Sequence, residues 1–278
     1  MRKLNSKFFL AGLIAFGFAS CDEENPLGGA GEVESKVGEL YILAEGTGSR
    51  IFNTVDLAMR DNDFITNDTT TIDGAMVTRA GAVVKIDYGN GASGSDGVLR
   101  EGEINLLMSG GGDYMVSGTS VAGTFLNYKE AGKPVTGSFN VANQGNDVFA
   151  LTLTSLSVTD TEDNTFSLSA SKTLTWVDGF STIGDVSDDS YTLSGTSTGV
   201  ADTITVTATI NTPLSYKSSC QYRLEEGIIN IDMAGTGVTY TSGSIDFISD
   251  DACNNLYTIE LNSTDGGFVT STLTFSGF

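Results

Sequence analysis

The chain has 278 residues, with 14 basic against 35 acidic side chains, a formal net charge of -21 and no histidine. An acidic surface repels the phosphate backbone, so a nucleic-acid partner is excluded. The missing histidine excludes Ser-His and Cys-His catalytic couples and His-containing metal sites, although enzymes that use paired carboxylates stay open.

Residues 1–20 have the layout of a secretory signal peptide. Three basic residues precede "FFLAGLIAFGF", an apolar run too short to span a bilayer, and two small residues then precede Cys21. This order resembles the lipobox of bacterial lipoproteins, in which a peptidase cuts before the cysteine and the thiol carries diacylglycerol. The resemblance implies a covalent lipid on Cys21 and a membrane anchor. An ordinary secretory signal with an incidental cysteine is the alternative.

Three carboxylates, Asp22, Glu23 and Glu24, directly follow Cys21. They resemble the acidic export signal of surface-exposed lipoproteins in Bacteroidota. The resemblance implies a position on the outer membrane, facing the cell exterior, whereas a merely hydrophilic tether would leave the chain facing the periplasm. The whole stretch 21–32, which ends in "NPLGGAGE", is predicted to be a flexible tether.

The segment 33–62 is predicted to be helical. Apolar residues recur at helical spacing from Val33 to Leu40 and again from Ile51 to Met59. The "GTGS" between them is expected to interrupt the pattern, so we predict one or two short helices.

The remaining segment, 63–278, is predicted to be a β domain. After about residue 76 the pattern changes to period two, with threonines alternating with apolar residues in runs such as "TITVTATI". Gly- and Asp-rich turns separate the runs. The predicted fold is all-β, either an antiparallel β-sandwich or a curled extended meander, after a short helical segment.

Cys220 and Cys253 remain to pair with each other if Cys21 carries the lipid. Their midpoint lies beside Gly237, in the turn signal "AGTG". A hairpin folded there places the two cysteines opposite each other or one residue off, and we predict a structural disulfide. Two free buried thiols are the alternative. The apolar alternation changes phase along the second strand, which predicts a bulge near Gly243.

Motifs spread over roughly residues 75–265 resemble a group of uncharacterised Bacteroidota lipoproteins. They are "VVKIDYGNG", "REGEINLLMSG", "VAGTFLNYKEAGKPVTGSFNVANQG" and "SSCQYRLEEGIINIDMAGTGVTYTSGSIDF". In that group a strand ending in I-D-F/Y-G precedes a glycine-rich turn. The resemblance implies the location and the fold class, and no activity.

Two acidic loops are weak candidates for Ca²⁺, although neither matches a known calcium pattern. They contain Asp160, Glu162 and Asp163 in one loop, and Asp185, Asp188 and Asp189 in the other. Trp176 could stack on a sugar ring, but it is in phase with Phe166 and Leu174, which favours a core position.

The predicted function is that of a non-catalytic lipoprotein of the cell envelope with a structural, adhesive or ligand-binding role. No catalytic residue and no cofactor beyond the lipid are predicted, and the expected partner is an extracellular glycan or protein. One alternative is a glycan-binding accessory of a nutrient-uptake system. The other is a carboxylate-dependent hydrolase.

Overall fold

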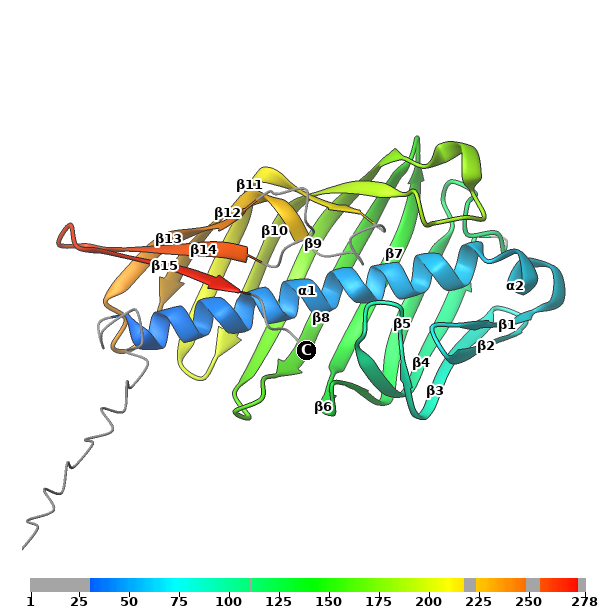
Figure 1. The fold of residues 1–278 in the computed structure, drawn as a ribbon, viewed down its shortest axis with the longest axis horizontal. Helices are drawn as coiled ribbons and strands as arrows, with labels where there is room; N and C mark the ends of the chain where they lie inside the picture. The colour runs from blue at the N-terminus through cyan, green and yellow to red at the C-terminus, as the bar shows by residue number, and fades with distance from the viewer. Residues whose placement is uncertain (1–30, 111, 218–223, 249–255, 275–278) are drawn as a thin grey trace, which may run out of the picture.

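A computed structural model of the chain describes residues 31–110, 112–217, 224–248 and 256–274. Its strands form one sheet that curls around a long helix, and Figure 1 shows this helix lying across the sheet. The helices are α1 (Glu32–Arg60), α2 (Asn62–Asn67) and the short 3-10 helix η1 (Phe180–Thr182). The strands are β1 (Thr69–Ile72), β2 (Ala75–Ala80), β3 (Val83–Ser93), β4 (Leu99–Ser109), β5 (Ser120–Glu130), β6 (Lys133–Pro134), β7 (Thr136–Gly145), β8 (Val148–Thr159), β9 (Thr165–Asp178), β10 (Ser190–Ala201), β11 (Ile204–Lys217), β12 (Leu224–Ala234), β13 (Tyr240–Phe247), β14 (Leu256–Ser263) and β15 (Phe268–Thr274).

The sheet is an antiparallel meander, because the order of its strands follows the chain. Each strand pairs with its neighbours in sequence, except that β6 pairs with β5 alone and β5 continues to β7. The all-β prediction is confirmed. Of its two alternatives, the single continuous sheet matches the curled extended meander.

The predicted helical segment is present, but the expectation that "GTGS" interrupts it is wrong. α1 continues unbroken for 29 residues. Packing explains the difference, since a Cβ atom on Gly48 would lie 2.7 Å from Leu153 Cδ1 of β8. Glycine here lets the helix approach the sheet closely, and this packing outweighs the poor helix propensity of glycine.

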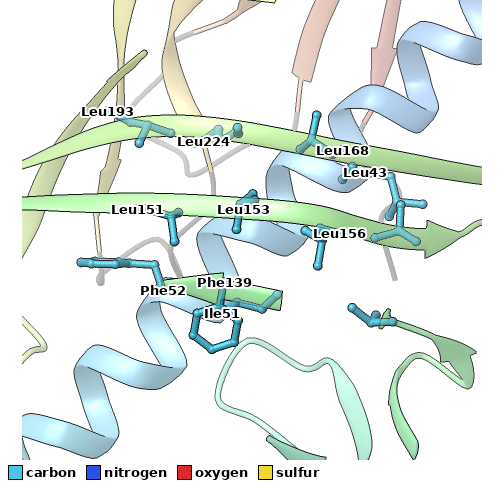
Figure 2. Close-up of a cluster of buried hydrophobic side chains, with 14 of the residues drawn as sticks. Leu43, Ile51, Phe52, Phe139, Leu151, Leu153, Leu156, Leu168, Leu193 and Leu224 are labelled. Carbon is cyan, nitrogen blue, oxygen red and sulfur yellow. The ribbon is translucent and has the colours of Figure 1, made fainter. Parts of the chain in front are cut away.

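The core lies between α1 and the inward face of the sheet. In Figure 2, Ile51 and Phe52 of α1 lie close to Leu151 and Leu153 of β8. The period-two pattern of the strands supplies the facing apolar layer. No helix within the described ranges is long and apolar enough to cross a membrane.

The two ends of α1 are held by different parts of the sheet. Near its start, the Glu34 carboxylate accepts hydrogen bonds from the amides of Thr239 and Tyr240 at 2.6 and 3.2 Å. Near its end, Arg60 forms an ion pair with Asp189, just before β10. α1 is therefore fixed at one end to the start of β13 and at the other to the start of β10.

The predicted hairpin around Gly237 is confirmed. β12 and β13 pair in one unbroken register from Gly227 to Asp232, and this register centres on Gly237. The expected irregularity is found just before Gly243, but on the side of β13 that pairs with β14.

We expect Gly48→Val to lower the free energy of unfolding by about 1–3 kcal/mol, the usual effect of overpacking a core. Helix propensity alone predicts the opposite sign, because valine favours a helix more than glycine does. Urea unfolding followed by circular dichroism measures the difference. Glu39→Val, on the partly exposed side of α1, is the control and should change stability by less than about 0.5 kcal/mol. Equal effects of the two variants would contradict the packing explanation.

Candidate functional site

Charged side chains are buried between α1 and the sheet. Glu45, Arg50, Asp56 and Arg60 of α1 are each at most 8% exposed, and each forms an ion pair. A charged group inside a protein costs free energy unless it is paired and hydrogen-bonded. The positions of the partners therefore restrict how α1 lies on the sheet.

The first charge cluster surrounds Glu45. Its Oε1 accepts hydrogen bonds from Lys172 Nζ at 2.9 Å, from the Tyr41 hydroxyl at 2.6 Å and from the Ser197 hydroxyl at 2.9 Å. Lys172 lies on β9 and points inward. Burial, together with the charge of Glu45, raises the pKa of Tyr41. The ion pair of Glu45 with Lys172 has no net charge. The groups that donate hydrogen bonds to Glu45 come from β9, β10 and α1.

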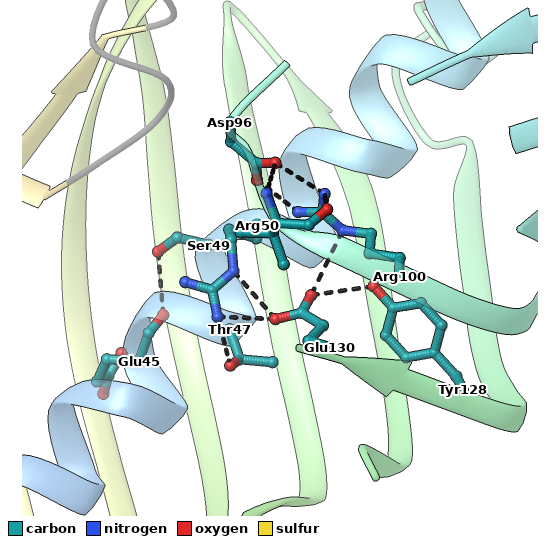
Figure 3. Close-up of polar contacts among 9 residues, drawn as sticks. Glu45, Thr47, Ser49, Arg50, Asp96, Arg100, Tyr128 and Glu130 are labelled. Atoms are coloured by element: carbon teal, nitrogen blue, oxygen red, sulfur yellow. Dashed lines mark hydrogen bonds and ion pairs between the residues drawn. The ribbon is translucent and has the colours of Figure 1, made fainter. Parts of the chain in front are cut away.

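The second cluster centres on Glu130 of β5, as Figure 3 shows. Arg50 donates two hydrogen bonds to Glu130 Oε2, at 3.0 and 2.7 Å, and the Tyr128 hydroxyl donates to Oε1 at 2.9 Å. Arg100 Nε lies 3.7 Å from the same Oε1, and Arg100 Nη2 pairs with Asp96 at 2.5 Å. Two guanidinium groups thus face two carboxylates, and their charges cancel.

The third cluster lies at the C-terminal end of α1. Arg60 pairs with Asp56, at 2.8 Å, and with Asp189. Its guanidinium also lies over the Trp176 ring, 4.4 Å from the centroid, and donates to the carbonyl oxygen of Ile183. Burial raises the pKa of Asp189, although Arg60 opposes the shift. Most side chains of the three clusters are buried, and their charges pair with one another between α1 and the sheet.

A polar pocket lies on the opposite, outward face of the sheet, across β3, β4 and β5. Its residues alternate with buried ones such as Ile86 and Ile104, which belong to the core. The pocket has a volume of about 390 Å³ and is lined by Asp87, Gly89, Asn90, Glu101, Gly102, Glu103, Leu126, Asn127 and Lys129.

Adjacent β-bulges form this pocket. The pairing of β3 with β4 shifts around Gly89, and the pairing of β4 with β5 shifts between Glu101 and Glu103. Gly102 has a φ of 77°, and a Cβ atom there would lie 2.3 Å from the carbonyl oxygen of Asn127. The sequence carried a signal, because glycines inside a strand pattern indicate bulges. The family resemblance implied a glycine-rich turn after "VVKIDYG", but residues 89–93, "GNGAS", belong to β3.

Two lysines hold the carboxylates of the pocket. Lys85 Nζ lies 2.9 Å from Asp87 and 3.5 Å from Glu103, and Lys129 Nζ lies 2.9 Å from Glu101. The hydrogen bond from Lys85 and that from the amide of residue 89 lower the pKa of Asp87. Asp87 is therefore ionised at neutral pH, which suits it to accept hydrogen bonds and not to act as a general acid.

The first acidic loop predicted as a weak calcium candidate is tied to neighbouring elements by lysines. Nζ of Lys36, on α1, lies 2.9 Å from Asp160 Oδ2 and 3.0 Å from Glu162 Oε2. Nζ of Lys133, on β6, lies 2.6 Å from Asp163 Oδ1. These carboxylates join the β8–β9 turn to α1 and β6.

The second acidic loop points its carboxylates in different directions. Asp185 accepts from the amide of Ser187, Asp188 accepts from the Thr182 hydroxyl, and Asp189 is buried against Arg60. Across the described part of the chain, no three Asp, Glu or Cys side chains are grouped so that they could hold a metal ion.

Other predicted site residues lie outside the described ranges. Lipid attachment, export signal and disulfide accordingly stay predictions. The residues concerned are Cys21, Asp22, Glu23 and Glu24 near the N-terminus, and the pair Cys220 and Cys253.

Trp176 is 3% exposed, which confirms the predicted core position. The three buried charge clusters, in contrast, were not predicted, and only Asp189 among the residues discussed in them was a predicted site residue, as a calcium candidate. One signal was available, because Lys172 shares the phase of Leu168 and Leu174 on a strand. A lysine in that phase points into the core and requires a buried anionic partner.

Comparisons with protein-family models, with curated proteins and with solved structures find no match for this chain. Its function must therefore be inferred from the residues and the geometry described above.

We expect Lys172→Met to lower the free energy of unfolding by about 3–5 kcal/mol, because it leaves the Glu45 carboxylate buried without its cation. The double variant Glu45→Gln/Lys172→Met removes both charges and should recover most of this loss. Urea unfolding of both variants and of the wild type measures the difference. If the double variant were as unstable as the single one, the unpaired charge would not be the cause.

Asp96→Asn should lower the free energy of unfolding at neutral pH. The difference in this free energy between the variant and the wild type should shrink below about pH 4. Burial alone would raise the pKa of Asp96, but the hydrogen bonds and charge of Arg100 outweigh burial and lower it. The resulting stabilisation is complete above the unfolded-state pKa of about 3.9 and is lost as the pH falls toward the folded-state pKa. Unfolding curves measured at several pH values test this. A difference that grew on acidification would contradict the assigned direction.

Proposed function

We propose that this chain is a non-catalytic lipoprotein of the cell envelope, anchored in the outer membrane by a lipid on Cys21 and facing the cell exterior. Its sheet has a structural, adhesive or ligand-binding role there. One observation carries this proposal: basic residues, a short apolar run, Cys21 and three carboxylates follow one another in that order. Several acyl chains on one cysteine give stable anchoring, at about 0.8 kcal/mol per buried CH₂.

The way α1 is held supports an anchored role. α1 begins at Glu32, eleven residues after Cys21, and an extended chain of that length reaches about 40 Å at most. A pull on the tether therefore acts on the start of α1. The ion pairs of Glu45 and Arg50 with the sheet oppose extraction of the helix, because extraction would leave charges unpaired in the core.

The outward pocket favours a ligand-binding role over a purely structural one. Asn90, Asn127 and Glu101 present amide and carboxylate groups beside Leu126, which is 51% exposed. Such groups accept and donate hydrogen bonds to hydroxyl-bearing ligands. A glycan-binding accessory of a nutrient-uptake system is therefore the second candidate. A hydrolase is less favoured, since its general acid requires a raised pKa and that of Asp87 is lowered.

Metabolic labelling with an alkyne fatty acid tests the anchor. We expect the wild-type chain to be labelled and to sediment with membranes, and Cys21→Ser to be unlabelled, because the thiol is the acylated group. Cys220→Ser is the matched control and should be labelled like the wild type. Equal labelling of the wild type and Cys21→Ser would overturn the proposed attachment.

Protease treatment of intact cells tests the exterior location. Peptides from residues 63–278 should be released, while a periplasmic marker protein stays intact. Complete protection in intact cells, followed by digestion after lysis, would place the chain inside the envelope.

A further inference from the structure

Between the ends of its strands, the outward face of β7 to β11 carries no charged side chain, although the chain has a net charge of -21. The charged residues within these strands are Lys172, which is buried, and Asp178 and Lys217 at strand ends. In Figure 1 α1 lies in front of the sheet, so this face is turned away from the viewer. We call it the hydroxyl face, and its main residues are Ser138, Asn140, Ala142, Ala150, Thr152, Thr154, Ser167, Ser169, Ser171, Thr173, Thr175, Thr192, Ser194, Thr196, Thr198, Val200, Thr205, Thr207 and Thr209.

Polar groups form rows across the hydroxyl face. One row passes through directly paired residues on five strands: Asn140, Thr152, Ser171, Thr196 and Thr209. Neighbouring strands lie about 4.8 Å apart, and alternate residues along a strand about 6.8 Å, so the groups form a regular array. Within the described chain these five side chains make no hydrogen bonds, and their donors and acceptors are therefore free for a ligand.

Acidic residues surround the hydroxyl face. Asp147 directly precedes β8, Asp202 lies in the β10–β11 turn, and Asp232 points outward from β12. This rim repels anionic polymers, and it repels a second copy of the same acidic chain. The rim disfavours anionic partners, and the array itself has no carboxylate that could pair with a cationic one, which leaves a neutral partner.

The chemistry of the hydroxyl face selects among neutral partners. It lacks the aromatic, methionine and arginine side chains that anchor most protein interfaces. Threonine and serine hydroxyls both donate and accept hydrogen bonds, as sugar hydroxyls do. A repeating polymer can use the array many times, so that individually weak contacts add up to useful affinity.

We propose that the hydroxyl face binds a neutral polysaccharide that lies across the strands. The polar pocket extends the same surface, because a row of paired residues continues from Ser138 through Thr124 and Asn105 to Lys85 at its edge. This inference builds on the ligand-binding role proposed above, but it does not depend on the anchor at Cys21. The outward sheet is thus the recognition surface.

Affinity electrophoresis of the full-length chain in detergent tests this binding. The gels contain dextran, laminarin or xylan as neutral polymers, and polygalacturonate as an acidic one. We expect at least one neutral polymer to retard the chain and polygalacturonate to leave it unretarded. The retardation should be the same from about 0.01 to about 1 M salt, over which the Debye length falls from about 30 to about 3 Å.

Thr196→Val/Thr209→Val removes two adjacent hydroxyls and keeps the β-branched shape of the side chains. This variant should bind the retarding polymer about tenfold more weakly, as expected for the loss of two hydrogen bonds. Thr69→Val/Thr71→Val, on exposed positions of β1, is the matched control and should bind like the wild type. Thermal melts of both variants confirm folding.

Three outcomes would overturn the proposal. They are no retardation by any neutral polymer, equal binding of the two double variants, and self-association in sedimentation that Thr196→Val/Thr209→Val abolishes while no polymer binds. Because the assay uses purified protein, a failure here is distinct from a failure of lipid labelling or of protease release, which test the anchor and the location.

Discussion

A single sheet must cover its apolar face, and the burial of α1 is the constraint on which this fold depends. A sandwich would use a second sheet for this purpose, whereas here the sheet curls around 29 residues of helix. A helix of that length is about 44 Å long, enough to cross many strands. Gly48 shows how closely the two elements approach, since a methyl group there would contact Leu153. Without α1, the inward face of the meander would be exposed.

Charges inside this core make the position of α1 specific. Apolar contacts alone would tolerate a helix displaced by one turn, because hydrophobic attraction has little directionality. A one-turn displacement would separate Glu45 from Lys172 and Arg50 from Glu130 at the same time. Buried ionic groups are best attested in this role of setting register. The inward face thus specifies the fold, and the outward face carries the pocket and the hydroxyl face.

Local patterns in the sequence predicted the strands, the helical segment and the hairpin around Gly237, because each depends on residues close in the chain. The same patterns show which side of a strand is buried but not what covers it, so sandwich and meander stayed open. "GTGS" was misjudged because the partner that favours Gly48, Leu153, is distant in sequence. The pocket depends on bulges in neighbouring strands, and in the sequence only the glycines of "GNG" indicated these bulges. The buried charges were indicated in the sequence by Lys172, which shares the phase of the buried residues of its strand.

The sequential order of the strands has a consequence for the order of folding. Each new strand can pair with the one made just before it, so most of the sheet forms through local contacts, which favour rapid folding. α1 is different, because it is made first, while the amides of Thr239 and Tyr240 that bind Glu34 are made about 200 residues later. Until β13 has been synthesised, the start of α1 lacks the backbone amides that bind Glu34 in the folded protein. The incomplete chain, whose apolar surfaces are still exposed, is therefore the form most prone to aggregation.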